Sequence, residues 1–190
     1  MNEHERSLLM SLHPRYATAI LDGKKSVELR RQRVAVPPGM KVILYATSPV
    51  MALVGTATVT AVQVGTPSEI WKAHKEHGAI TRRDYLNYMK GAEQASALLL
   101  DAATPFSDPV PLAHLRAGGS FHPPQSYRYV DPDTLRGWVQ GHPTADEVLC
   151  DSSPRPAAAS ETEAASRSQA QRSTGAPLGS SMILAQHVAA

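Results

Sequence analysis

The order of the apolar segments is the feature that most restricts the fold of this chain. Runs typical of buried strands lie at residues 7–12, 40–46, 51–64, 95–100 and 121–130, and a more charged strand follows Gly23. Helical spacing of apolar residues recurs at 14–22, 67–77, 81–89 and 132–140. The segments before the last helix are ordered strand, helix, three strands, two helices and two strands, which is neither alternating βαβ nor all-β. The order predicts an α+β fold, a small curved mixed sheet or barrel with flanking helices.

The charged strand after Gly23 has two different faces. Because successive side chains of a strand alternate, Val27 and Leu29 point to one face and Glu28 and Arg30 to the other. Lys25 precedes the strand and can project over the same polar face. A carboxylate and a guanidinium side by side can orient each other and leave donors free for a ligand. The alternative is a solvated edge strand whose charges discourage aggregation; in either case we expect Lys25 and Glu28 outside the core.

The spacing of Gly23, Lys25, Glu28 and Arg30 resembles the G-x-K-x-x-E-x-R motif of the ASCH family, whose members are related to PUA-like folds. Three further segments, at residues 11–16, 44–49 and 121–129, resemble those that flank the motif in bacterial members and fall in the same order. The resemblance covers roughly residues 7–130. It implies a PUA-like barrel and a cleft, lined by the motif, that holds RNA or a nucleoside.

The motif supplies the first group of candidate binding residues. Lys25, Arg30 and Arg31 have the charged donors that bind a nucleic-acid backbone. Glu28 can accept a hydrogen bond from an exocyclic amino group of a base. We therefore expect an RNA or nucleotide ligand at this strand.

Two other segments supply further candidates, each with a structural alternative. Tyr45 and Ser48, at a strand end, can stack on a base and bond to it, or they can be a core residue and a turn residue. Gln125, Ser126 and Arg128 have the composition of a recognition edge, or belong to an ordinary packed final strand.

Two other hypotheses compete with simple binding: an enzyme, which would be an amidohydrolase or a ribonuclease, and an adaptor protein. Some small ASCH proteins resemble amidohydrolases of acetylated cytidine, with a proposed site of lysine, threonine and glutamate, and another branch is proposed to cleave RNA. Lys25 and Glu28 are thus the catalytic candidates, but Glu28 stands where those amidohydrolases carry the threonine, and a carboxylate is a poor substitute for a hydroxyl nucleophile. A transcription-linked adaptor with a recruiting tail is a third hypothesis.

Two weaker patterns are set aside. His74 and His77 are three residues apart on an expected helix, but no carboxylate or cysteine at ligand spacing accompanies them, so we predict no metal site. The helices at 67–77 and 81–89 resemble a helix-turn-helix, yet they lie between two expected strands and are better explained as an insertion that caps the barrel. No cofactor motif is present, and we expect none.

Composition sets the domain boundaries. We expect a domain at residues 7–130, a closing helix at 131–142 and a disordered tail at 143–190, because the tail has no aromatic residue and is rich in Ala and Ser. Residues 1–142 carry a net charge of +4 and the tail carries −2, which is compatible with nucleic-acid binding.

Cys150 is the only cysteine, no apolar run is long enough to span a membrane, and the N-terminus does not resemble a signal peptide. We therefore expect a cytoplasmic protein with no membrane partner, and the sequence leaves its oligomeric state open.

Overall fold

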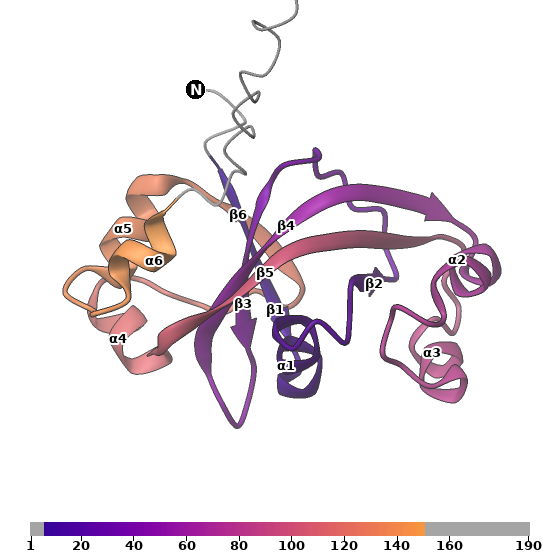
Figure 1. The fold of residues 1–190 in the computed structure, drawn as a ribbon, viewed down its shortest axis with the longest axis horizontal. Coiled ribbons are helices and arrows are strands. Elements are labelled where there is room, and N and C mark those ends of the chain that lie inside the picture. Colours follow the sequence, from indigo (N-terminus) through magenta and orange to yellow (C-terminus); the bar gives the residue numbers. More distant parts are fainter. Residues whose placement is uncertain (1–5, 151–190) are drawn as a thin grey trace, which may run out of the picture. The chain divides into compact units, whose positions relative to one another are not determined.

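The computed structural model describes residues 6–150, which form a six-stranded sheet in the order β2-β5-β4-β3-β1-β6 with helices at its ends (Figure 1). The strands are β1 (Ser7–Leu12), β2 (Val27–Arg30), β3 (Lys41–Ala46), β4 (Ala52–Gly65), β5 (Ala95–Pro111) and β6 (Tyr127–Val130). The helices are α1 (Pro14–Leu21), α2 (Pro67–His74), α3 (Arg82–Tyr88), α4 (Leu112–Ala117), α5 (Pro132–Val139) and α6 (Ala145–Leu149). β1 pairs parallel with β3 and the other neighbours pair antiparallel, so the expected α+β class with a mixed sheet is confirmed.

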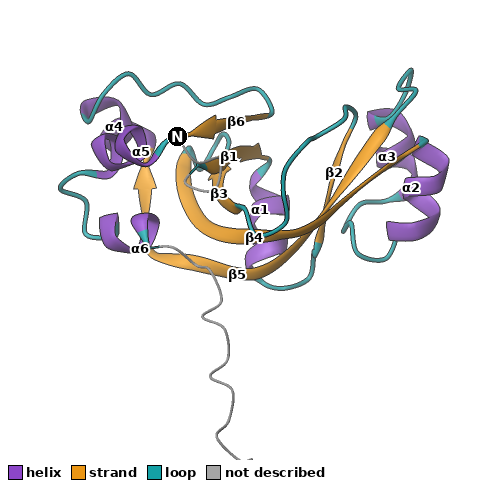
Figure 2. Ribbon diagram, turned by 90° about the horizontal axis from the view of Figure 1, so that it is seen from above, coloured by secondary structure: helices purple, strands orange, loops and turns teal. Residues whose placement is uncertain are grey.

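The long strands β4 and β5 give the sheet its curvature. They are 14 and 17 residues long, and Figure 2 shows both bending along their length. Register shifts interrupt their pairing at three points between Leu53 and Ala61. Such irregularities bend a strand and increase its twist. The sheet therefore curls into half a barrel, with β2 and β6 as its two edges.

The central strands contribute to a core on each face of the sheet. Leu8 of β1 and Val42 of β3 belong to one buried cluster, with α1. Leu9 and Ile43, the next residues on the same strands, belong to a second cluster with Trp138 of α5. This division follows from the alternation of side chains along a strand. It also explains why these strands read as continuous apolar runs in the sequence.

The helix starts follow local rules that the sequence makes visible. α2 begins with a capping box, in which Thr66 accepts from the backbone N–H of Glu69 and the Glu69 carboxylate accepts from that of Thr66. Pro14 and Pro67 occupy the first helical positions of α1 and α2. The chain turns after α1 at Gly23, which has a φ of 72°. The expected helices at 14–22, 67–77 and 81–89 are confirmed, with slightly shorter bounds.

α2 and α3 form an insertion between two paired strands. They connect β4 to β5, which lie side by side in the sheet. Ile70 and Tyr85 of the two helices pack with Val27 and Leu29 of β2 in a third buried cluster. The pair therefore covers one end of the sheet, as expected from its place in the sequence.

Two stretches differ from the expected elements. The strand expected at 95–100 is longer in the structure, because β5 continues to Pro111 through three prolines, at positions 105, 109 and 111. Within residues 6–150, β2 pairs with residues 96–99 of β5 and no strand pairs with the later part of β5 on that side, so this edge tolerates proline. The last strand is shorter than the expected 121–130, since only Tyr127–Val130 pairs, with β1.

The C-terminal part of the described chain packs beyond the expected boundary. The tail was expected to begin at residue 143, yet Thr144 and Val148 are fully buried and α6 joins the second core. Lys41 Nζ, from β3, donates to the carbonyl oxygens of Val148 (2.6 Å) and Cys150 (2.5 Å). The rest of the expected tail, 151–190, lies outside the described residues. Among helices of residues 6–150, none is long and apolar enough to cross a membrane.

Candidate functional site

Three charged residues of the motif are buried together. Lys25 is 3% exposed, Glu28 6% and Arg30 7%. Strand β2 alternates as expected: Val27 and Leu29 enter the core beneath α2 and α3, and Glu28 and Arg30 point to the opposite face. The expectation that Lys25 and Glu28 lie outside the core is wrong: both side chains are buried, Lys25 against the carbonyl oxygen of Gly78 and Glu28 between Lys25 and Arg30.

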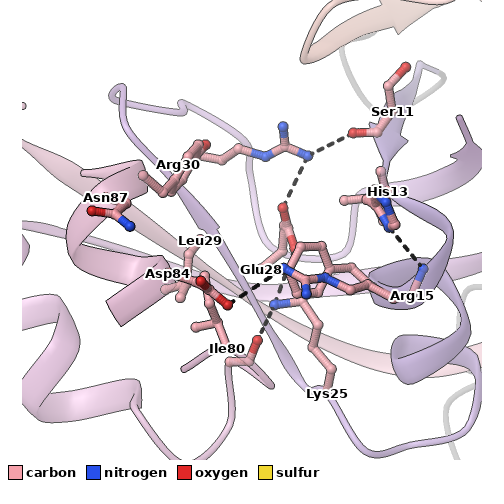
Figure 3. A pocket seen from close by; sticks show the side chains of 14 residues that line it. Ser11, His13, Arg15, Lys25, Glu28, Leu29, Arg30, Ile80, Asp84 and Asn87 are labelled. Atoms are coloured by element: carbon pink, nitrogen blue, oxygen red, sulfur yellow. Dashed lines mark hydrogen bonds and ion pairs between the residues drawn. The ribbon is translucent and has the colours of Figure 1, made fainter. Parts of the chain in front are cut away.

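The Glu28 carboxylate links the two cations. Its Oε2 lies 3.3 Å from Lys25 Nζ and its Oε1 lies 3.2 Å from Arg30 Nη2 (Figure 3). Each oxygen therefore faces one cation. Buried charges of this kind persist when they are paired and hydrogen-bonded.

Lys25 is held by three acceptors. Besides Glu28, its Nζ donates to the carbonyl oxygens of Val27 (2.7 Å) and Gly78 (2.6 Å). Burial lowers the pKa of the Lys25 ammonium, and the neighbouring Glu28 carboxylate opposes that shift. Three acceptors match the three hydrogens of an ammonium group. Lys25 therefore positions Glu28 and the β2 turn, and in this arrangement it has no lone pair to offer as a base.

Arg30 reaches from one edge of the sheet towards the other. Its Nη1 donates to Ser126 Oγ (3.0 Å) and its Nη2 to the carbonyl oxygen of Ser11 (3.3 Å). Ser11 lies near the end of β1, and Ser126 directly precedes β6. Within residues 6–150, the buried Arg30 Nε and Ser11 Oγ have no hydrogen-bond partner.

These charged groups form one wall of a cavity of about 370 Å³. Tyr16 of α1 and Tyr88 at the end of α3 contribute aromatic rings to its lining, and Asp84 and Asn87 of α3 contribute polar groups. His13 and Arg15 lie on the α1 side (Figure 3). We call this space the first cavity.

The mouth of the first cavity carries a loose polar contact. Arg15 Nη2 lies 3.9 Å from Asp84 Oδ2, so that groups of α1 and α3 face each other. His13 caps α1 by accepting from the Arg15 backbone N–H at Nδ1 (3.3 Å). Burial raises the pKa of the Tyr88 hydroxyl, which favours its neutral, hydrogen-bonding form.

A second cavity, of about 530 Å³, lies beyond Arg30. It is lined by Arg30, Arg31, Gln32, Tyr88, Gln125, Ser126 and Tyr127. Arg30 and Tyr88 therefore line both cavities. Arg31 is exposed, and its Nη2 donates to the carbonyl oxygen of Lys90 (2.9 Å).

The structure brings together six of the residues expected to bind a ligand. Lys25, Glu28 and Arg30 line the first cavity, and Arg30 is joined at the second cavity by Arg31, Gln125 and Ser126. The end of β2 and the segment before β6 are 96 residues apart in sequence, and the Arg30–Ser126 hydrogen bond connects them.

The other three expected residues lie elsewhere. Tyr45 is buried in the second core beside Phe121, with ring centroids 5.7 Å apart. Ser48 is exposed and lines neither cavity. The Arg128 guanidinium packs over the ring of Trp138, 4.6 Å from its centroid, on that same face of the sheet.

Sequence reasoning missed the residues that the helices contribute. Tyr16, Asp84, Asn87 and Tyr88 line the first cavity, but they lie in segments that read as ordinary amphipathic helices. For these four residues the sequence offered one signal: Tyr16 lies two residues after the His13-Pro14 pair that starts its helix.

His74, the last residue of α2, and His77, in the turn after it, are not gathered into a metal site. His74 is buried, its Nε2 lies 2.7 Å from Gln63 Oε1, and burial lowers its imidazole pKa. Within residues 6–150, no group of three or more side chains could hold a metal ion.

Comparison with known proteins assigns the family. The sequence profile of the ASCH domain matches residues 10–104, which contain the whole β2 motif and both insertion helices. The chain belongs to the ASCH domain family. An ASCH domain-containing ribonuclease from Zymomonas mobilis is 33% identical over 127 residues, covering 66% of this chain and 84% of that protein.

Solved structures agree with this assignment. An ASCH protein from Zymomonas mobilis matches with a TM-score of 0.66 and 30% identity over 70% of this chain and 93% of that one. A serine-to-alanine variant of the Zymomonas protein matches with a TM-score of 0.67 and 28% identity, over 73% and 97% of the two chains. These neighbours and the curled sheet confirm the PUA-like fold that the motif implied.

Proposed function

We propose that this ASCH domain binds RNA or a nucleotide, with one base held in the first cavity. The observation that carries the proposal is the buried cluster of Lys25, Glu28 and Arg30 on the wall of a 370 Å³ cavity that also has aromatic rings. Small-molecule sites in proteins have volumes of about 300–1,000 Å³, so one nucleoside is a suitable size.

The lining suits a base chemically. Single-stranded nucleic acids are recognised by stacking bases on aromatic rings and by hydrogen bonds to their exposed edges. Tyr16 and Tyr88 supply rings, and Asp84 and Asn87 supply a carboxylate and an amide at the mouth. Both oxygens of Glu28 are already paired with cations, so Asp84 and Asn87 are better placed to read a base edge than Glu28 is.

The buried cluster also argues for function over stability alone. An ion pair inside a protein often contributes no more stability than well-packed apolar residues of the same size would. A purely structural strand end therefore does not require three charges here. A site that must present a rigid guanidinium to a ligand does, because Glu28 and Ser126 fix the orientation of Arg30.

A second candidate function is RNA cleavage, favoured by the name of the Zymomonas relative, a ribonuclease. His13 lies at the first cavity with Nδ1 occupied as an acceptor, so its Nε2 would carry the proton in the neutral imidazole. His13 is the group we assign to proton transfer in this case. Amidohydrolysis of acetylcytidine is disfavoured, since Lys25 has its three hydrogens engaged and Glu28 replaces the nucleophilic threonine.

The binding proposal is tested by titrating the ¹⁵N-labelled full chain with short single-stranded RNAs. We expect amide shifts at Leu29, Asn87 and Tyr88 and an affinity that falls with salt, with a slope of about −0.7 per phosphate contact. Shifts confined to exposed basic residues outside the cavity, or no binding, would contradict it. RNA cleavage is tested in parallel on labelled RNA, with His13→Ala expected to abolish any cleavage and to leave RNA binding measurable.

A further inference from the structure

The two cavities differ in charge although they meet at Arg30 and Tyr88. The first contains Arg15, Lys25 and Arg30, but the carboxylates of Glu28 and Asp84 offset most of that charge. Among the described residues that line the second cavity, Arg30 and Arg31 are cations and none is a carboxylate. A neutral base therefore suits the first cavity, and an anion suits the second.

The second cavity also has the donors that a phosphodiester needs. The guanidinium of Arg31 is exposed, and its hydrogen bond to the Lys90 carbonyl fixes it at the rim. The amide of Gln125 and the hydroxyl of Ser126 come from the segment before β6, at the other edge of the sheet from β2. A fork-shaped guanidinium with neutral donors facing it is a common arrangement around phosphate oxygens.

Arg30 and Tyr88 form the boundary between the two spaces. Arg30 uses Nη2 for Glu28 and the Ser11 carbonyl, and one hydrogen of Nη1 for Ser126. The second hydrogen of Nη1 is not used by these contacts. Tyr88 is 39% exposed, so part of its ring faces open space where the cavities join. A ligand that passes from one cavity to the other would therefore meet a donor and an aromatic face at the crossing.

From this arrangement we infer that the second cavity is a subsite for the phosphate and the next nucleotide of a strand whose base occupies the first cavity. The inference rests on the proposed function and specifies its ligand. The ligand is a single-stranded oligonucleotide of two or more nucleotides, and a free nucleoside fills half of the site.

The test compares each of the four ribonucleosides with the matching homotrinucleotide, by NMR titration of the full chain. We expect the best trinucleotide to bind at least tenfold more tightly than its nucleoside. We expect both Arg31→Ala and Gln125→Ala to reduce this affinity ratio at least threefold, and Gln125→Ala to reduce it less than Arg31→Ala does. Arg33→Ala is the matched control, because Arg33 is exposed, close in sequence and lines neither cavity, and it leaves the ratio within twofold of the wild type.

Three results would overturn the inference. Equal affinities for nucleoside and trinucleotide would leave the proposed base site standing but remove the subsite. Equal losses in Arg31→Ala and Arg33→Ala would show that diffuse charge, and not the second cavity, attracts the strand. If the wild type bound neither class of ligand, the proposed function would fail together with the subsite.

Discussion

The Arg30 guanidinium and the Ser126 hydroxyl, 3.0 Å apart, join the two edges of the curled sheet. β2 is the first strand of the sheet order and β6 the last, so this hydrogen bond and the one from Arg30 to the Ser11 carbonyl span the open side of the half-barrel. The same guanidinium lines both cavities. Closure of the sheet and formation of the proposed ligand site therefore depend on one residue.

Replacing Glu28 by glutamine should destabilise the fold strongly. The change leaves the buried cations Lys25 and Arg30 without their carboxylate, and breaking a buried ion pair costs about 3–5 kcal/mol. The free energy of unfolding in urea measures the effect. Asp22→Asn is the matched control, since its pair with Lys24 is exposed and is worth less than about 1 kcal/mol. An equal loss of unfolding free energy in the two variants would show that the buried ion pairs of Glu28 stabilise the fold no more than an exposed ion pair does.

Ser126→Ala should have a smaller effect on stability. The change removes the hydroxyl that accepts a hydrogen bond from Arg30 Nη1. Because this bond lies beside a cavity, water can replace the hydroxyl, and we expect the free energy of unfolding to fall by about 1 kcal/mol. Thermal unfolding at a single pH measures it, with Ser48→Ala as the exposed control. A loss no greater than that of the control would mean that the bond between the sheet edges contributes nothing to closure.

Tyr88→Ala should weaken RNA binding by about 1–3 kcal/mol, the usual contribution of stacking one base on an aromatic ring. Because Tyr88 is partly exposed, the fold should tolerate the change. Fluorescence anisotropy with a labelled single-stranded RNA gives the affinity. Leu86→Ala, on the same helix and 56% exposed, lines neither cavity and should bind as the wild type does. Normal binding by Tyr88→Ala would place the base elsewhere.

Stability should fall in mild acid because of His74. Burial lowers its imidazole pKa in the folded state, so the unfolded chain binds the proton more readily. The contribution is fully present above the unfolded pKa of about 6.5 and is lost progressively as the pH falls below that value. Urea unfolding at pH 7.5 and 5.5 should show a smaller loss for His74→Gln than for the wild type. The exposed control His122→Gln should behave as the wild type, and the same pH dependence in all three proteins would exclude His74 as the cause.

Local signals in the sequence predicted most of the fold. The capping box at Thr66 and the prolines that start α1 and α2 act within a few residues, so the sequence alone reveals them. The prolines near the end of β5 cannot be interpreted by a local rule alone. A local rule treats proline as a breaker, whereas a free strand edge accepts it, and which edges are free is decided only by the sheet as a whole.

The site was predictable only in part, for the same physical reason. Alternation along β2 correctly placed Glu28 and Arg30 on one face. The burial of the charged cluster was not visible, because its contacts come from distant segments: Gly78 bonds to Lys25, and Ser11 and Ser126 bond to Arg30. Tyr45 is an error in the other direction. Its place at a strand end suggested an accessible binding residue, but its ring lies in the core that α4 and α5 cover.

The most direct test of the central claim is a crystal structure of the chain with a bound trinucleotide. The account predicts one base in the first cavity, between the rings of Tyr16 and Tyr88, with the following phosphate near Arg30 and Arg31. A strand bound instead along α3 at Arg82 and Arg83, with the first cavity empty, would contradict it.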